Sequence, residues 1–224
     1  MTLTIAWEKI ETVFLDMDGT LLDLHFDNYF WLEHLPRHYA DKHSMDIEQA
    51  RETLYERMAN VEGSLNWYCL DYWSRELDVD IVALKREVMH LIRVHEQVID
   101  FLDAVRAAGK RLVLLTNAHH GSLEIKIEKT GINGHFDRVI SSHDLKLAKE
   151  NPGFWEGLGQ MEPFHSDHAM LIDDSLSVLR NAQTFGLAEV IAVRWPDTKQ
   201  AERSVDQFQS VRGVGELLSS LDVK

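Results

Sequence analysis

The chain has 224 residues, of which 45% are hydrophobic and 27% charged, a balance typical of a soluble globular protein. Its formal net charge of −14 argues against a nucleic acid or an anionic membrane surface as a partner. The single cysteine excludes an intrachain disulfide, and the sequence shows neither a secretory leader nor an apolar run of membrane length. We therefore expect a cytoplasmic protein that is a monomer or a homodimer.

The N-terminal part predicts one strand followed by a long helical insertion. The short apolar run 13–15 reads as a buried β-strand that ends at an Asp-x-Asp-Gly-Thr sequence. After it come four stretches with helical periodicity and capping residues, at 27–43, 46–61, 64–77 and 80–92. Pro36 is expected to interrupt the first of these helices. Together they predict an all-helical cap over residues 23–95.

Beyond residue 95 the sequence alternates between apolar runs and amphipathic segments. Strands are expected at 111–117, 136–141, 169–174 and, as the last one, 190–193. Helices are expected at 98–108, 122–129, 154–161 and 175–185, with a weak one at 215–221. This alternation predicts an α/β fold, a doubly wound, Rossmann-like parallel sheet formed by residues 1–22 and 96–224.

Three of the expected strands end in polar side chains. These side chains are Asp16, Asp18, Thr116, Asn117, Asp173 and Asp174. Open α/β sheets bind ligands at the carboxyl ends of their strands, so we expect the six to converge on one crevice. Lys149 follows in a polar loop and adds a positive charge, with Lys146 as the nearby alternative. Carboxylates this close invite a divalent cation, and the whole set suits phosphoryl transfer.

The motif Asp16-Met17-Asp18-Gly19-Thr20-Leu21 resembles the first motif of haloacid dehalogenase-like phosphohydrolases. Thr116, Lys149 and the pair Asp173-Asp174 are similar to the second, third and fourth motifs of that superfamily, in the same order. The cap stretches 26–31 and 65–73, and the segment 115–119, resemble the bacterial GMP/IMP nucleotidases in particular. The resemblance covers nearly the whole chain and implies the same capped fold.

The resemblance also implies a mechanism. It implies a Mg²⁺-dependent phosphomonoesterase that hydrolyses purine nucleoside 5′-monophosphates through an aspartyl phosphate on Asp16, with Asp18 as general acid and base. Thr116 and Lys149 would hold the phosphate and the nucleophile. The implied metal ligands are Asp16, Asp18 and Asp174, with Asp173 as the competing carboxylate, because Val178 stands where the family has another polar residue.

Further side chains are expected to contact the substrate, a small phosphorylated metabolite. The candidates are Gly19 and Asn117 near the phosphate and Asn28, Trp67, Tyr68 and Asp71 in the cap. The alternative function is a phosphatase of the same family that acts on sugar phosphates or another small metabolite. The sequence predicts no zinc site, since the twelve histidines have no zinc-like spacing, and it predicts that Cys69 is a small buried apolar residue.

Overall fold

Within residues 5–221, which the computed structural model describes, the chain forms a six-stranded sheet in the order β3-β2-β1-β4-β5-β6. All five strand pairings are parallel, which confirms the predicted doubly wound α/β fold. The strands are β1 (Thr12–Leu15), β2 (Arg111–Thr116), β3 (Arg138–Ser141), β4 (Ala169–Asp173), β5 (Glu189–Val193) and β6 (Gln209–Val211). Residues 1–4 and 222–224, which the sequence assigns to the same unit, lie outside the described residues.

The expectation that 190–193 is the last strand is wrong, because β6 follows it and pairs with Ile191–Val193. Strand β6 has three residues and lies at the edge of the sheet, and only Val211 is buried. An edge strand this short carries no apolar run and no clear alternation, so its sequence does not predict it.

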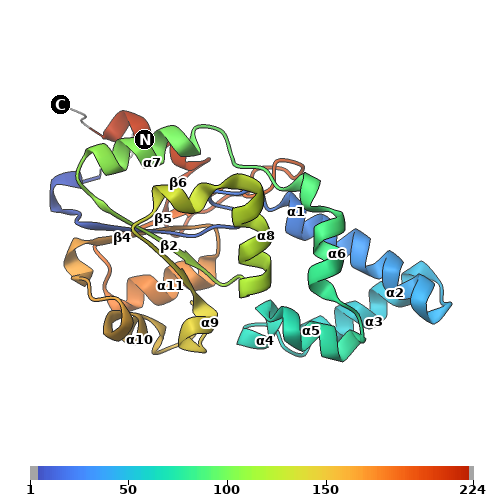
Figure 1. Cartoon of the computed structure of the whole chain (residues 1–224). Helices are drawn as coiled ribbons and strands as arrows, with labels where there is room; N and C mark the ends of the chain where they lie inside the picture. The colour runs from blue at the N-terminus through green and yellow to red at the C-terminus, as the bar shows by residue number, and fades with distance from the viewer. Residues whose placement is uncertain (1–4, 222–224) are drawn as a thin grey trace.

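Helices cover both faces of the sheet (Figure 1). On one face lie α7 (Val98–Ala107), α8 (His120–Thr130) and the 3₁₀-helix η6 (Val214–Ser220); on the other lie α9 (Ser142–Leu145), α10 (Phe154–Met161) and α11 (Leu176–Phe185). Successive side chains of a strand point to opposite faces, so Val13 and Leu15 of β1 join the first apolar cluster and Phe14 joins the second. Short 3₁₀-helices occur at Trp7–Lys9, Ile132–His135 and Ser166–His168.

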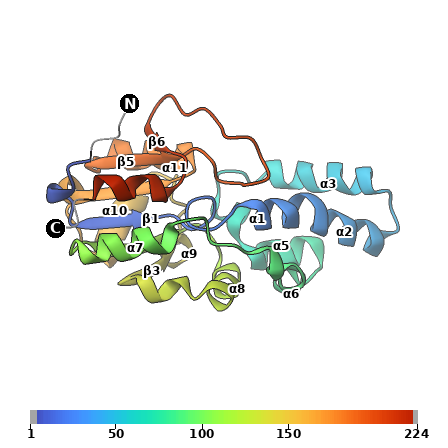
Figure 2. The ribbon, with the colours of Figure 1, turned by 90° about the horizontal axis from the view of Figure 1, so that it is seen from above.

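The residues between β1 and α7 form a helical projection at one side of the sheet, called the cap below (Figures 1 and 2). Its elements are α1 (His25–Tyr29), a π-helical turn η2 (Phe30–His34), α2 (Leu35–His43), α3 (Ile47–Ala59), α4 (Leu65–Tyr68), α5 (Leu70–Leu77), α6 (Ile81–Glu87) and the 3₁₀-helix η3 (Met89–Leu91). The apolar cluster on the α7 side of the sheet continues into the cap through residues such as Phe26 and Phe30. The insertion of helices after the first strand is therefore confirmed.

Two of the expected cap helices are interrupted, each for a local reason. Pro36 has no N–H to donate within the helix, and the wider π turn Phe30–His34 directly precedes its helix, with Leu35 N–H donating to Phe30 O. The expected helix 64–77 is broken at Cys69, whose backbone is extended and whose Sγ accepts the Tyr72 N–H at 3.4 Å. Cys69 thus caps the N-terminus of α5. Among the described residues no helix is both long and apolar enough to cross a bilayer.

Candidate active site

The sheet register brings the three polar strand ends to one edge. Leu15 of β1 is level with Leu114 of β2 and with Ile172 of β4. Asp16 therefore follows the central strand between its two neighbours, and its N–H donates to Ile172 O at 3.0 Å. Because all strands are parallel, their carboxyl ends meet here without any long-range distortion of the backbone.

Lys149 lies at the centre of this edge. Its Nζ donates to Asp16 Oδ1 and to Asp173 Oδ2, each at 2.6 Å, and to Leu115 O at 3.0 Å. The side chain is only 1% exposed, whereas Lys146 is exposed. Although burial opposes the charge, the two carboxylates raise the pKa of Lys149 above its ordinary value. This geometry supports Lys149 rather than Lys146 as the charge beside the nucleophile.

The adjacent residues Asp173 and Asp174 differ in the contacts that their carboxylates make. Both oxygens of Asp173 are engaged, one by Lys149 and the other by the Ser175 N–H at 2.8 Å. The carboxylate of Asp174 has Arg203 Nη2 at 3.4 Å from Oδ2. Burial, followed by the charges of Asp16 and Asp173, raises the pKa of Asp174 well above its usual range. Asp174 is therefore the carboxylate whose environment favours an added cation.

Oxygens of Asp16, Asp173 and Asp174 lie within 4.8 Å of one another, a spacing that suits a single oxygen-coordinated ion. Gly19 makes room for this group. Its φ of +91° is a left-handed conformation, and a Cβ there would lie 2.8 Å from Asp174 Cγ. A side chain at position 19 would displace Asp174, so this position acts on the site through packing. Val178 is fully buried and apolar, and therefore supplies no ligand.

Asp18 belongs to a buried chain of alternating charges, Asp18–Lys126–Asp27–Lys85, called the ion-pair chain below. Lys126 Nζ lies 2.7 Å from Asp18 Oδ2 and 2.7 Å from Asp27 Oδ2, and Lys85 Nζ lies 2.6 Å from Asp27 Oδ1. Both lysines are 1% exposed. The chain runs from the catalytic edge of the sheet through α8 into cap helices α1 and α6. It fixes the orientation of the Asp18 carboxylate.

The charges of this chain shift each other's titration. Burial raises the pKa of Asp18 to about 6 against the opposing effect of Lys126. Burial acts in the same direction on Asp27, but Lys126 and Lys85 together hold its pKa below the ordinary value. Burial lowers the pKa of Lys85, whose Nζ also lies 4.6 Å from the centre of the Phe30 ring. A pKa near 6 suits a group that both donates and accepts a proton near neutral pH.

The sequence analysis did not predict the ion-pair chain, in which Lys85 is buried. Asp27 is separated from Lys85 by 58 residues and from Lys126 by 99. No local pattern connects them, and Arg203 beside Asp174 was missed for the same reason.

Thr116 and Asn117 end β2 on the same edge. Thr116 is 1% exposed, and its Oγ1 accepts the Ala118 N–H at 3.0 Å. Asn117 uses both ends of its amide, since Oδ1 accepts the Lys149 N–H and Nδ2 donates to Glu150 Oε2, each at 2.9 Å. Asn117 thereby positions the loop that carries Lys149. The fold and the geometry of this edge of the sheet are those expected of a phosphohydrolase active site. Comparison with known proteins gives the family.

The model of the haloacid dehalogenase-like hydrolases matches residues 10–186, more than half of the chain. The protein belongs to this family. It is 38% identical over 221 residues to the GMP/IMP nucleotidase YrfG of Escherichia coli (strain K12), which covers 99% of this chain and 100% of the relative. A shorter match, 23% identical over 65% of each chain, is the pyrophosphatase PpaX of Bacillus velezensis.

Solved structures of other haloacid dehalogenase-like proteins share the fold. A HAD phosphatase from Thermococcus onnurineus superimposes with a TM-score of 0.79 at 22% identity, over 96% of this chain and 99% of the other. The magnesium-bound putative HAD-hydrolase YfnB from Bacillus subtilis gives a TM-score of 0.62 at 18% identity, over 95% and 99%. At these identities the likeness extends to the fold, cap included.

In this haloacid dehalogenase-like hydrolase, a cavity of about 430 Å³ lies between the catalytic edge and the cap, a volume in the range of small-molecule sites. Asp16, Asp18, Thr116, Lys149 and Asp174 line it from the sheet. The cap contributes mainly apolar and aromatic side chains, namely Leu24, Trp31, Leu32, Met58, Trp67, Tyr68, Leu70 and Trp73. Polar atoms at one end and aromatic rings at the other suit a ligand with a phosphate and a flat apolar group.

The four cap residues singled out from the sequence have different positions. Asn28, Trp67 and Tyr68 line the cavity. Asn28 Nδ2 donates to Asp197 Oδ2 at 2.7 Å, and the Tyr68 hydroxyl donates to Glu150 Oε1 at 2.8 Å. Asp71 does not line the cavity; its carboxylate is 70% exposed and lies 3.6 Å from His119 Nε2. The geometry gives no support to Asp71 as a substrate contact.

Proposed function

We propose that this hydrolase removes the phosphate from purine nucleoside 5′-monophosphates, GMP and IMP above all. The observation that carries the proposal is the cavity, which joins a phosphoryl-transfer edge to an aromatic wall in the cap. The full-length similarity to a protein named GMP/IMP nucleotidase supports the same substrate class. Aromatic walls favour a nucleobase because each base presents a flat face for stacking.

The chemistry we infer proceeds in two displacements at phosphorus. An Asp16 oxygen forms a bond to phosphorus while the ester oxygen leaves with the bonding electron pair, and Asp18 gives that oxygen a proton. Water then attacks the aspartyl phosphate, Asp18 takes back a proton, and the Asp16 carboxylate is regenerated. Lys149 holds Asp16 in place throughout and offsets charge near the phosphate. Thr116 lines the cavity beside Asp16, and we infer that it binds a phosphate oxygen.

The donor set of the site fits Mg²⁺. Three carboxylates converge within 4.8 Å, and the positive charges of Lys149 and Arg203 lie beside them. We propose that Asp16, Asp174 and the backbone carbonyl of Asp18 hold the ion, and that Asp173 orients Lys149 instead of ligating. When bound, the ion offsets the repulsion between the Asp16 carboxylate and the phosphate dianion.

Base recognition in the cap rests on two groups. Trp67 and Tyr68 both line the cavity, and we infer that one of their rings supplies a stacking surface. The Asn28 amide gives its Nδ2 to Asp197, which leaves Oδ1 as its acceptor. GMP and IMP carry a proton on N1, whereas AMP does not, so an acceptor here favours the first two. Asn28→Ala is therefore expected to reduce the preference for GMP over AMP.

The test is kcat/KM for GMP, IMP, AMP, ribose 5-phosphate and glucose 6-phosphate at one Mg²⁺ concentration. Stacking of one base is worth about 1–3 kcal/mol, or roughly 5- to 150-fold in favour of GMP over ribose 5-phosphate. If ribose 5-phosphate is hydrolysed as well as GMP, the base is not recognised, and the alternative of a sugar phosphate phosphatase replaces the nucleotidase. The variant Asn66→Ala, at an exposed cap asparagine that does not line the cavity, serves as the matched control for Asn28→Ala.

A further inference from the structure

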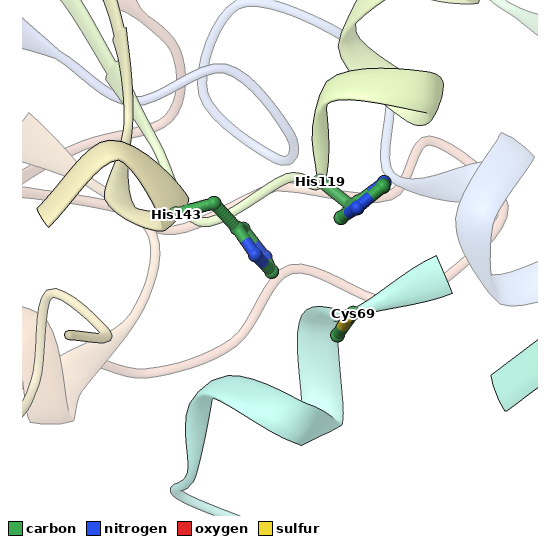
Figure 3. A group of neighbouring side chains, drawn as sticks. All are labelled: Cys69, His119 and His143. Atoms are coloured by element: carbon green, nitrogen blue, oxygen red, sulfur yellow. The ribbon is translucent and has the colours of Figure 1, made fainter. Parts of the chain in front are cut away.

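A second group of potential metal ligands lies outside the catalytic cavity. Cys69, His119 and His143 each place one ligand atom within 4.8 Å of the other two (Figure 3). In Figure 3 the three side chains point toward a common space from three separate elements. Cys69 caps α5 in the cap, His119 caps α8 and His143 lies in α9. A thiolate and two imidazoles are ligands preferred by Zn²⁺ and similar cations, not by Mg²⁺.

His143 provides an independent indication of a missing partner. Its Nε2 is buried and has no hydrogen-bond partner within the described part of the chain. An unpaired buried ring nitrogen costs free energy that a metal ion would recover.

The contacts of His119 are compatible with the same role. Its Nδ1 accepts only a long hydrogen bond of 3.3 Å from Gly121 N–H, which coordination would replace at little cost. Its Nε2 lies 3.6 Å from Asp71 Oδ2. Metal-bound histidines usually donate their second ring N–H to a carboxylate, and Asp71 is placed for that contact. This gives Asp71 a function away from the substrate.

We propose that Cys69, His119 and His143 form a transition-metal site, of the Zn²⁺ class, that fastens the cap to the sheet. The ligands come from both sides, since Cys69 belongs to the cap and the two histidines to the segment after it. Tyr68 and Leu70 on either side of Cys69, and Ala118 before His119, line the catalytic cavity. A metal here closes the seam beside the cavity and hinders the exchange of substrate and product.

Besides the buried Asp27–Lys126 pair described above, several polar contacts between partly exposed groups join the cap to the rest of the chain. They include Tyr68 to Glu150 at 2.8 Å, Asn151 Nδ2 to Gly63 O at 3.1 Å and Arg86 to Glu128 at 2.7 Å. Contacts of this kind between partly exposed groups are individually weak. One metal bridge with three protein ligands is a much stronger tie, so occupancy of the site would shift the cap toward its closed position.

The binding test uses Co²⁺ as the probe on protein freed of metal with EDTA. Cobalt bound to a thiolate gives a charge-transfer absorption in the near ultraviolet that carboxylate-bound cobalt lacks. We expect this band in the wild-type protein and in His120→Ala, and its loss in Cys69→Ser and His143→Ala. Serine retains the helix-capping acceptor of Cys69, and alanine at position 143 removes an unpaired polar atom, so both variants should fold. Absence of the band in the wild-type protein overturns the site.

A second readout uses the fact that Cys69 is the only cysteine of the chain. Zn²⁺ should protect it from alkylation by iodoacetamide in the wild type and in His120→Ala, but not in His143→Ala. Equal alkylation with and without Zn²⁺ contradicts the site even if turnover changes. The variant His120→Ala is a matched control because His120 is adjacent, half exposed and paired with Asp144 at 3.0 Å.

The effect on the cap is tested by Zn²⁺ inhibition of p-nitrophenyl phosphate hydrolysis at saturating Mg²⁺. Zn²⁺ at the carboxylate cluster would inhibit the wild type and Cys69→Ser alike. Zn²⁺ at the proposed site should inhibit the wild type at concentrations at least about 10- to 100-fold lower than those that inhibit Cys69→Ser. Metal affinity falls by this factor when a residue that hydrogen-bonds to a metal ligand is replaced. Equal inhibition of both proteins refutes the fastening of the cap.

Discussion

Replacement of Lys126 by methionine tests whether the ion-pair chain orients Asp18. The four charges of the chain alternate in sign and sum to zero, and Lys126 contacts both Asp18 and Asp27 at 2.7 Å. Methionine keeps the length and apolar stem of lysine but leaves the two carboxylates without the cation between them. Breaking a buried ion pair costs about 3–5 kcal/mol, a large part of the roughly 5–15 kcal/mol that stabilises a typical protein.

The catalytic effect follows from the same contacts. Without Lys126 the pKa of Asp18 rises further above about 6, since Lys126 is the group that lowers it, and the carboxyl loses its fixed orientation. Loss of a general acid and base costs about 10²–10⁴-fold, so we expect kcat for GMP to fall by a factor within that range. The loss should be smaller with p-nitrophenyl phosphate, whose leaving group needs less protonation.

The assay combines thermal unfolding with steady-state turnover of both substrates. Lys129→Met is the control, because Lys129 is exposed on the same helix α8. The double variant Lys126→Met/Asp27→Asn removes one charge of each sign, and should recover part of the lost stability without recovering turnover. If Lys126→Met unfolds at the wild-type temperature and turns over GMP at the wild-type rate, the ion-pair chain does not orient Asp18.

Four further predictions concern the catalytic edge. Asp16→Asn should abolish turnover and leave the thermal unfolding transition intact, because an amide does not replace the carboxylate nucleophile; steady-state hydrolysis by the purified variant would contradict the covalent scheme. Lys149→Ala should lower kcat/KM by roughly 10²–10³-fold, whereas Lys146→Ala should leave it unchanged. If Lys146→Ala has the larger effect, Lys146 and not Lys149 is the catalytic lysine. Asp174→Ala should raise the Mg²⁺ requirement more than Asp173→Ala, since both Asp173 oxygens are already engaged. Burial raises the pKa of Asp16 to about 6, so below that pH a proton competes with the metal for the carboxylate. The increase in unfolding temperature that Mg²⁺ produces should therefore become smaller as the pH falls from about 8 to about 5. An increase that stays constant over this range would contradict the prediction.

The sequence by itself determined the fold class and the central part of the site. An apolar run that ends in Asp16 and Asp18, and later runs that end in Thr116 and in Asp173, report buried parallel strands through local periodicity alone. Parallel strands place their carboxyl ends together, so the convergence of these residues follows from topology without knowledge of side-chain contacts. The interpretation of 27–92 as helices inserted after the first strand rests on the same local periodicity.

The tertiary structure decided what depends on how the cap packs against the sheet. Asp27 meets Lys126, Tyr68 meets Glu150, and Cys69 meets His119 and His143, although tens of residues separate the partners in each case. Whether Asp173 or Asp174 is the better candidate for a metal ligand likewise depends on a tertiary contact, because Lys149 and Ser175 already engage both oxygens of Asp173. Periodicity reports which face of an element is buried, but it does not report which distant residue lies opposite. The contacts of Asp18, of Tyr68 and of the Cys69, His119 and His143 group, on which our proposals rest, are all of that long-range kind.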